Sequence, residues 1–424
     1  MATGLALLIA FVLGFIGVPI GAAFIVGATS AAALAAPQLL YTFPTVILRP
    51  FDNFTLLAVP LFIIAAEFIL RAGVGQILVK AASRVIGDRG LPAGVVGIGM
   101  FFAGITGSSV AEASALGRLL LPLMAARGFR KNDVAGLMAV TGTLGILIPP
   151  SIPLIIYGLL TETSISRLFL AGTVPGFLFG GLLCIVASFW VRRDVMPARE
   201  SQIDRKEGES ALHLSLMFIV ALSLPVLMLG GIYGGFGTPT EIAALVALYA
   251  AVVMIVRQPL QAPVFLLESS KETAYATSSL FFILIGTSLI GFLATGERIP
   301  QQVAQWIAAQ GVGKWEFLLV LNLLLLAMGC VLDGMSMMLL VVPLLFPAAK
   351  ALGVDPVHFG IIVVVNIEIG LIHPPVGMNL FAITAATGLE LKAVTRSVLP
   401  YVPVALAFLL LITLIPWLSV GFLR

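Results

Sequence analysis

Charged residues and cysteines are scarce in this 424-residue chain. Only 10% of the residues are charged, the formal net charge is +3, and there are two cysteines, Cys184 and Cys330. So small a net charge gives no indication of nucleic-acid binding. Two cysteines in apolar surroundings form no metal or redox pattern and are best read as buried, inert thiols. The sequence also has no Walker-type nucleotide-binding loop, so ATP does not power this chain directly.

The chain is instead rich in long apolar runs. Hydrophobic residues make up 60% of the chain, and its mean hydropathy is +1.13, which excludes a soluble globule of this length. A bilayer crossing needs roughly 20 apolar residues. The first run, Leu5–Ala36, is too long for a signal peptide and lacks a basic start. We predict full spans at 4–35, 53–72, 168–191, 214–233, 239–256, 276–295 and 397–421.

One sequence pattern occurs twice. Thr141–Pro150 reads Thr-Gly-Thr-Leu-Gly-Ile-Leu-Ile-Pro-Pro, and 225 positions later Asn366–Pro375 reads Asn-Ile-Glu-Ile-Gly-Leu-Ile-His-Pro-Pro. Helix breakers keep this offset over a long window, pairing Gly104 with Gly329, Pro122 with Pro347, Gly128 with Gly353, Gly145 with Gly370 and Pro175 with Pro400. Breakers repeated in register predict paired broken helices around a binding site at the membrane midplane, which is typical of secondary transporters.

The repeat predicts an all-α polytopic membrane protein made of two halves. The first repeat, 1–191, holds a re-entrant helical hairpin at about 92–126 and a broken transmembrane helix at about 133–160. The linker is 192–213. The second repeat, 214–424, holds a hairpin at about 316–350 and a broken helix at about 358–386. Three shorter or mixed segments are predicted to lie at the membrane interface: 75–87, 258–273 and 298–311.

Lysine and arginine counts in the loops predict the orientation. With the polar segment Arg192–Ser210 placed in the cytoplasm, sixteen basic residues fall inside and six outside. The N terminus is then cytoplasmic and the C terminus is outside, in the periplasm. The first hairpin opens to the cytoplasm and the second to the outside, so the two repeats are predicted to have inverted topology, as alternating access requires.

Polar residues gather at the predicted hairpin tips and helix breaks. Ser108 and Ser109 offer hydroxyl oxygens, although small residues at such a tip also serve close helix packing. Asp333 corresponds to Ser108 in the repeat, and a charge inside the membrane is a functional candidate, the alternative being a wetted loop at the interface. Glu368 is either a cation ligand or a structural acceptor. Glu67, Glu112 and His373 are weaker candidates, and the four tryptophans read as interface anchors.

These motifs resemble the large membrane subunit of tripartite ATP-independent periplasmic (TRAP) transporters, the DctM-like family. The resemblance covers essentially the whole chain, and its strongest stretches are Phe101–Ala111, Gly142–Pro153, Leu168–Gly176 and Asn366–Phe381. Two positions depart from the family pattern. Thr106 stands where the family usually has serine and keeps the hydroxyl, whereas His373 stands in place of threonine and removes one.

The resemblance implies a sodium-coupled elevator-type importer in the bacterial inner membrane. Its substrate would be an organic acid, such as a C4-dicarboxylate or sialic acid, delivered by a periplasmic binding protein, and a small four-span membrane subunit would complete the complex. The residues implied for the first sodium site are Ser108, Ser109, Thr141, Gly142 and Gly145, and those for the second are Asp333, Gly334, Asn366 and Gly370. The residues implied for the anion are Gly107, Ser108, Ser109, Pro149, Pro150, Pro374 and Pro375.

Other classes of membrane protein stay open at this point. A stand-alone sodium- or proton-coupled anion carrier of the wider ion transporter superfamily would share hairpins and broken helices without needing a binding protein. A channel fits inverted hairpins less well. A membrane-embedded enzyme is the poorest reading, because the spans carry no nucleophile–base pair or metal-ligand cluster.

Overall fold

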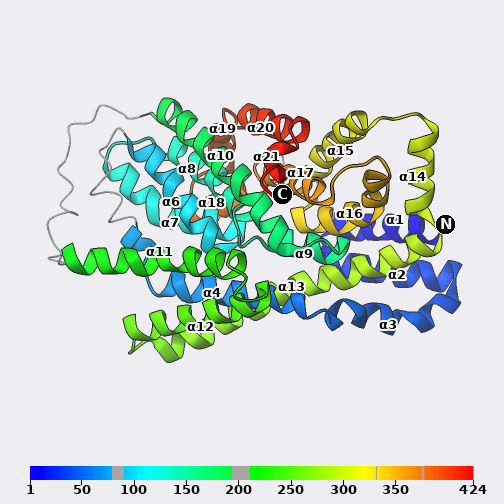
Figure 1. The fold of residues 1–424 in the computed structure, drawn as a ribbon, viewed down its shortest axis with the longest axis horizontal. Coiled ribbons are helices and arrows are strands. Elements are labelled where there is room, and N and C mark those ends of the chain that lie inside the picture. Colours follow the sequence, from blue (N-terminus) through cyan, green and yellow to red (C-terminus); the bar gives the residue numbers. More distant parts are fainter. Residues whose placement is uncertain (79–89, 193–210, 331, 375–376, 424) are drawn as a thin grey trace.

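The computed structural model describes residues 1–78, 90–192, 211–330, 332–374 and 377–423, with the backbone alone at 211–218 and 221. The described residues form helices and contain no β-strand (Figure 1), so the all-α prediction is confirmed. Six helical segments in this part of the chain are long and apolar enough to cross a membrane. They are Phe54–Arg71, Ser109–Ala126, Ile165–Trp190, Pro239–Arg257, Ala262–Gly296 and Gly334–Ala351.

The predicted span 4–35 is wrong, because two shorter helices occupy it. Helices α1 (Ala2–Phe15) and α2 (Ile20–Ala35) pack against each other and are joined by a turn that contains Gly17, whose φ is +92°, and Pro19. Gly27 permits the close packing, since a Cβ there would lie 2.5 Å from the carbonyl oxygen of Ala6. The turn brings the N terminus back toward the end of the molecule at which α2 ends (Figure 1).

The N terminus therefore lies beside a segment from which the sequence separated it. The Met1 amine bonds the carboxylate of Glu297 at 2.5 Å, and Glu297 directly follows α13 (Ala262–Gly296). The basic-residue count placed the N terminus in the cytoplasm, and Arg298, the neighbour of Glu297, is one of the six residues that it placed outside. That pair of placements is wrong, because the two residues share one end of the molecule.

Two further predicted boundaries differ from the structure. The segment 258–273 is not a separate interface segment, since most of it belongs to the continuous 35-residue helix α13, which has no glycine or proline between Pro263 and Gly286. The predicted span 397–421 is instead divided into α19 (Leu391–Val398), α20 (Val402–Leu414) and α21 (Trp417–Val420), and α19 and α20 bend by 48°. Pro400 and Pro416 lie at the two breaks.

The predicted hairpins and broken helices correspond to matched pairs of helices. The hairpins are α6 (Leu91–Thr106) with α7 (Ser109–Ala126), and α15 (Lys314–Gly329) with α16 (Gly334–Ala351). The first broken helix is α8 (Lys131–Thr141), the short 3₁₀ helix η5 (Gly142–Ile146) and α9 (Ile152–Thr161); the second is α17 (Pro356–Gly370) and α18 (Met378–Thr387). Both ends of α7 and α16 are 225 residues apart, the offset of the sequence repeat.

Some of the helices pack across the two halves of the chain. The remaining described helices are η1 (Pro37–Thr42), α3 (Phe43–Leu48), η2 (Arg49–Asp52), η3 (Phe54–Leu57), α4 (Ala58–Arg71), α10 (Ile165–Trp190), α11 (Ala211–Tyr233), α12 (Pro239–Arg257) and α14 (Ile299–Ala309). Helix α4 of the first half packs on α12 of the second, and α2 of the first half packs on α13 of the second. Shifted by 225 residues, α2 overlaps α12 and α4 overlaps the end of α13. The α4–α12 contact and the α2–α13 contact are therefore equivalent under the sequence repeat.

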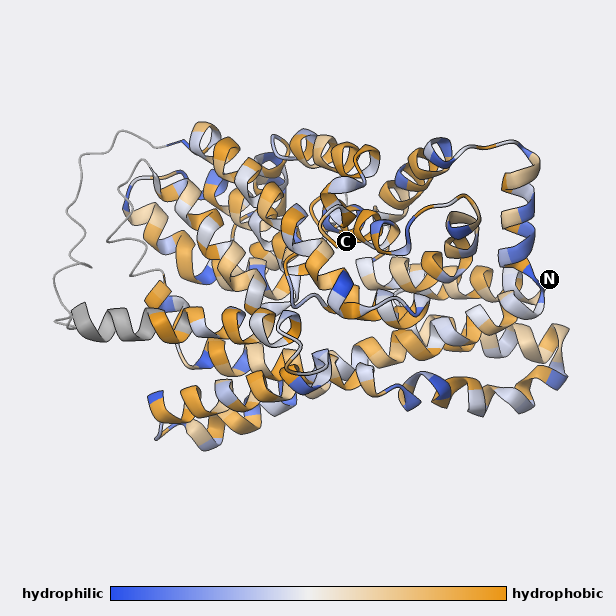
Figure 2. Ribbon diagram, viewed as in Figure 1, coloured by the Kyte–Doolittle hydropathy of each residue, from blue (hydrophilic) through white to orange (hydrophobic). Residues whose placement is uncertain are grey.

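The outer helices are covered with apolar residues (Figure 2). Phe15 and Phe189 are both 86% exposed, which suits a lipid environment and not water. The four tryptophans are exposed at or near helix ends, as interface anchors are: Trp190, Trp306, Trp315 and Trp417.

Candidate functional site

The tips of the two hairpins meet at one cavity of about 490 Å³. Residues 106–111 of the first hairpin and 333–335 of the second line it. Helices α4 and α13 complete the wall and contribute Glu67 and Glu272. The structure thus brings together five of the residues singled out from the sequence, namely Gly107, Ser108, Ser109, Asp333 and Gly334.

The first tip is held against the first helix break. Gly107 has a φ of +59°, and a Cβ there would lie 2.6 Å from the carbonyl oxygen of Pro150. The Gly107 carbonyl also accepts a hydrogen bond of 3.5 Å from the Ile152 amide. Gly145 faces the same tip, since its Cβ would lie 3.2 Å from the carbonyl oxygen of Ser108. Only glycine fits at these contacts.

Oxygen atoms around this break fit a hard cation. Gly142 lies against the backbone of α7, with its Cβ position 2.8 Å from the Ala113 nitrogen. Thr141 is fully buried, and its hydroxyl has no hydrogen-bond partner among the described residues. Unwound carbonyls and buried hydroxyls are the donors that broken transporter helices offer to sodium. Thr141, Gly142 and Gly145 thus lie at one break beside the first tip, and the Thr141 hydroxyl is an oxygen that could hold a cation there.

Asp333 caps a helix at the second tip. Its carboxylate accepts hydrogen bonds from the amides of Met335 (3.0 Å) and Ser336 (3.1 Å) and from the Ser336 hydroxyl (2.5 Å). The side chain is partly buried and lines the shared cavity, so it is an N-cap as well as a charge at the site. A Cβ on Gly334 would lie 2.2 Å from the Ile367 side chain, which fixes this tip against α17.

The second tip also touches the second break. A Cβ on Gly329 would lie 3.0 Å from the Cα of Gly370, and both glycines line a small void of about 10 Å³ together with Asp333 and Gly334. Such a void has room for about one water-sized occupant. Asn366 lies deeper in α17: its amide group donates to Asn322 Oδ1 and the Ile362 carbonyl, both at 2.9 Å, and its own oxygen has no partner in the part of the chain that the structure describes.

The described prolines that were predicted to contact the anion are not among the residues that line the shared cavity. Among the described residues, Pro149, Pro150 and Pro374 do not line it, and Pro375 lies outside the described residues. Pro150 lines a separate small void beside Gly104. His373 Nδ1 lies 3.5 Å from Cys330 Sγ, so it packs against the second hairpin.

Two carboxylates predicted as candidates from the sequence are buried in the helices. Glu112 is 0% exposed and Glu368 is 1% exposed, and neither makes a hydrogen bond of ordinary geometry in the described part of the chain, although the Thr106 hydroxyl lies near Glu112 and the Thr143 hydroxyl near Glu368. One Glu112 oxygen lies 2.5 Å from the Cβ position of Gly145, which places this carboxylate beside the first break. Glu368 lies in the neighbourhood of Glu112. Their position inside predicted membrane segments was the sequence signal for a functional role, because a charge in a span is costly.

Asn379 is a polar residue that the sequence did not single out. Its side chain exchanges hydrogen bonds of 2.7 and 3.1 Å with the Ser109 hydroxyl and donates to the Ala139 carbonyl at 2.8 Å. The first hairpin is thereby tied to α18 of the other repeat. The position of Asn379, a few residues beyond the second Pro-Pro pair, was the only sequence signal.

The wall formed by α4 and α13 carries an ion-pair network. Arg71 Nε lies 3.6 Å from Glu67 Oε2, and the Arg71 guanidinium also pairs with Glu268. Glu67 and Glu272 extend the cavity toward the end of α4 that carries Arg71. This is the side that the basic-residue count predicts to be cytoplasmic.

Known proteins match this chain over most of its length. It is 40% identical over 376 residues to the C4-dicarboxylate TRAP transporter large permease protein DctM of Pseudomonas aeruginosa, covering 87% of this chain and 86% of that protein. It is 34% identical over 372 residues to the sialic acid TRAP transporter large permease protein SiaM of Vibrio cholerae, covering 86% and 85%. In fold it is similar to the YdaH transporter of Alcanivorax borkumensis, with a TM-score of 0.64 at 15% identity over 92% of this chain and 90% of that one.

The pattern of the DctM component of the tripartite ATP-independent periplasmic transporters matches residues 7–418. Hairpin tips that share a cavity, apolar helices and relatives of similar length all agree with that match. The chain therefore belongs to the DctM family, the large membrane permeases of TRAP transporters.

Proposed function

We propose that this permease imports an organic acid anion together with sodium ions, and that the anion occupies the cavity between the hairpin tips. The observation that carries the proposal is the composition of that cavity. Its lining holds three carboxylates, Glu67, Glu272 and Asp333, and none of the described lining residues is a lysine or arginine. An anion entering such a cavity needs accompanying positive charge, which co-bound sodium would supply.

The sodium ions would lie at the two tip-and-break junctions. Ser108, Ser109, Thr141, Gly142 and Gly145 would hold the first. Asp333, Gly334, Asn366 and Gly370 would hold the second. The side-chain oxygens of Thr141 and Asn366, which have no partner among the described residues, support this assignment, and we add Glu112 to the first site because its carboxylate lies beside Gly145.

The N-terminal ends of α7 and α16 support a carboxylate substrate. Both helices have 18 residues and begin at the cavity, so the positive ends of their dipoles point to it. The named substrates of the two relatives, a C4-dicarboxylate and sialic acid, are both carboxylates. We infer a substrate of this class for the present chain.

The family also supports a multi-subunit complex in the bacterial inner membrane. We propose that a periplasmic binding protein delivers the substrate, that a small four-span subunit completes the membrane part, and that hairpins and broken helices move together as an elevator. Inverted topology of the two repeats would give this motion its two end states.

Reconstituted uptake tests the proposal. The permease, co-purified with its small subunit, is placed in proteoliposomes and supplied with binding protein and radiolabelled succinate or sialic acid. We expect uptake under an inward sodium gradient, no uptake when potassium replaces sodium, and no effect of ATP. Equal uptake in potassium would contradict sodium coupling. Full uptake by the permease alone would instead support the stand-alone anion carrier.

A further inference from the structure

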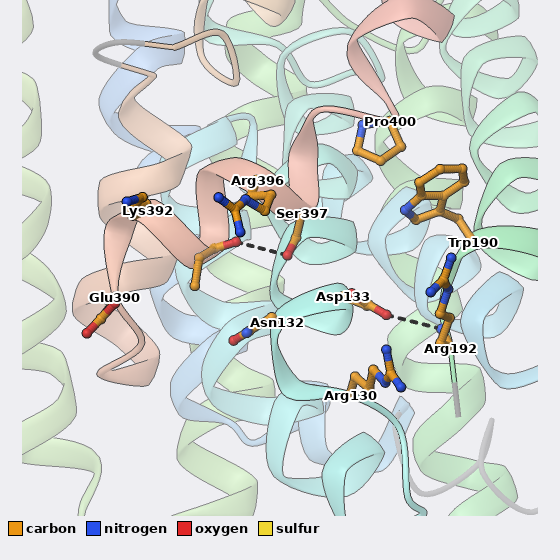
Figure 3. Close-up of a pocket in the computed structure, with 11 residues that line it drawn as sticks. Arg130, Asn132, Asp133, Trp190, Arg192, Glu390, Lys392, Arg396, Ser397 and Pro400 are labelled. Carbon is orange, nitrogen blue, oxygen red and sulfur yellow. Dashed lines mark hydrogen bonds between the residues drawn. The ribbon is translucent and has the colours of Figure 1, made fainter. Parts of the chain in front are cut away.

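A second, polar cavity of about 470 Å³ lies away from the hairpin tips, where the start of α8, the end of α10 and α19 come together (Figure 3). Among its lining residues are Arg130, Arg192, Lys392 and Arg396, against the carboxylates of Asp133 and Glu390. The lining thus carries four positive charges and two negative ones. The transport site has the opposite balance, so this pocket is not part of it.

The fold builds this basic pocket from three elements. The Arg130 amide donates to the Arg192 carbonyl at 3.2 Å, and the Arg192 amide donates to Asp133 at 3.3 Å, which joins the start of α8 to the end of α10. Gly136 lets α19 approach α8, since its Cβ would lie 2.6 Å from the Ser397 Cβ. Lys392 and Arg396 are one helical turn apart and extend from the same face of α19.

Three of these positive charges, on Arg192, Lys392 and Arg396, have no ion-pair partner among the described residues. Asp133 bonds the backbone of Arg192 and not its guanidinium. Figure 3 shows Glu390 at the edge of the pocket, far from Arg192.

Part of the pocket lining is apolar. Trp190 and Pro400 line it, and Trp190 is 46% exposed (Figure 3). A tryptophan at this place is typical of the membrane interface. Basic groups next to exposed apolar side chains offer contacts both to a phosphate group and to the hydrocarbon chains attached to it.

We propose that this basic pocket binds a phosphate-bearing anion, and that its occupant is the headgroup of an acidic phospholipid. Arg192, Lys392 and Arg396 would hold the phosphate, while Trp190 and Pro400 would contact the glycerol and the start of the acyl chains. The proposal is independent of which substrate the permease transports, because it concerns different residues and a different readout.

Binding of short-chain lipids tests the pocket directly. The purified permease in a neutral detergent is titrated with dioctanoyl phosphatidylglycerol, dioctanoyl phosphatidylcholine or glycerol 3-phosphate, and its thermal unfolding midpoint is followed. The pocket variant is Lys392→Gln/Arg396→Gln. The matched control, Arg167→Gln/Lys350→Gln, removes the same charge from exposed positions outside the pocket. We expect phosphatidylglycerol to raise the midpoint of the wild type and the control, and phosphatidylcholine to act more weakly.

The pocket variant should require about thirtyfold more phosphatidylglycerol, since each basic residue near an anionic headgroup contributes about 1 kcal/mol. Equal responses of the pocket and control variants would overturn the proposal. If glycerol 3-phosphate acts at the concentrations at which the lipid does, the pocket binds phosphate but the lipid assignment is wrong.

A gain of affinity gives a test that a folding defect cannot imitate. Glu390 precedes α19 and its side chain makes no capping hydrogen bond, so Glu390→Gln removes a repelling charge without removing a cap. This variant should bind phosphatidylglycerol several-fold more tightly than the wild type. Unchanged or weaker binding would count against a charge-selective site.

Discussion

Glu112 shows how one side chain sets the conditions around the first helix break. It is fully buried, its oxygens make no hydrogen bond of ordinary geometry among the described residues, and Gly145 leaves the space that its carboxylate fills. When it is ionised, a carboxylate buried in this way is destabilising unless a cation accompanies it. Gly145 and Glu112 therefore depend on each other, since the glycine leaves the room that the carboxylate needs.

Replacing Gly145 tests that relationship. In Gly145→Ala the new methyl group would lie 2.5 Å from the Glu112 oxygen and 3.2 Å from the Ser108 carbonyl, so one of them must move. We expect a loss of about 1–3 kcal/mol in stability and a much lower sodium-dependent uptake. Gly97→Ala is the control, because nothing lies within 4 Å of its Cβ position and it is in a helix. Equal activity of the two variants would rule out the tight contact.

Asp333 allows charge to be separated from capping. Asparagine caps helices about as well as aspartate, so Asp333→Asn should keep α16 intact while removing one negative charge from the cavity. The sodium concentration for half-maximal uptake should rise several-fold. Asp355→Asn is the matched control, since Asp355 caps α17 through Val357 and His358 and does not line the cavity. An unchanged sodium dependence in a well-folded Asp333→Asn protein would leave Asp333 as a cap alone.

At the scale of elements, the sequence predicted those features that occur twice. The glycines and prolines at the tips and breaks are repeated at one offset, and each hairpin begins and ends within two residues of its predicted bounds. The turn at Gly17 and Pro19 is unpaired in the repeat, and no polar residue lies near it. An apolar run of this length reads as one span, so the two-helix structure of residues 2–35 could not be predicted.

The residues of the site were predicted unevenly for a similar reason. Ser108 and Asp333 were found because they lie at breaks that the repeat marks. Asn379 was not, because its role depends on a contact with Ser109, 270 residues away, which only the fold creates. Glu272, which lines the cavity, was missed because it belongs to 258–273, a segment that was predicted to lie at the membrane interface.

The position of the N terminus gives a topology prediction. An N-terminal epitope and a cysteine replacing exposed Gln310, at the end of α14, should be accessible from the outside of intact cells. A cysteine replacing Lys131 at the start of α8 should react with an impermeant maleimide only after the membrane is opened. The background lacks Cys184 and Cys330. Accessibility of the epitope and of Lys131→Cys from one side would contradict this arrangement.

At the scale of the whole molecule, the two halves of the chain pack against each other and line the central cavity together. Both tips line one cavity, Ser109 bonds Asn379 across the halves, and the α4–α12 and α2–α13 contacts exchange helices between them. Neither half encloses the shared cavity alone. The elevator motion that we propose must then take place inside a frame to which both halves contribute.

This exchange of helices also constrains how the permease is made. Helices α2 and α4 leave the ribosome with one face that has no partner, because α12 ends only at Arg257 and α13 only at Gly296. At roughly 5–20 residues per second, α4 waits on the order of ten to forty seconds before α12 is complete. During that interval the first half depends on lipid or on the insertion machinery to cover it, so the permease matures only when the second half has been synthesised.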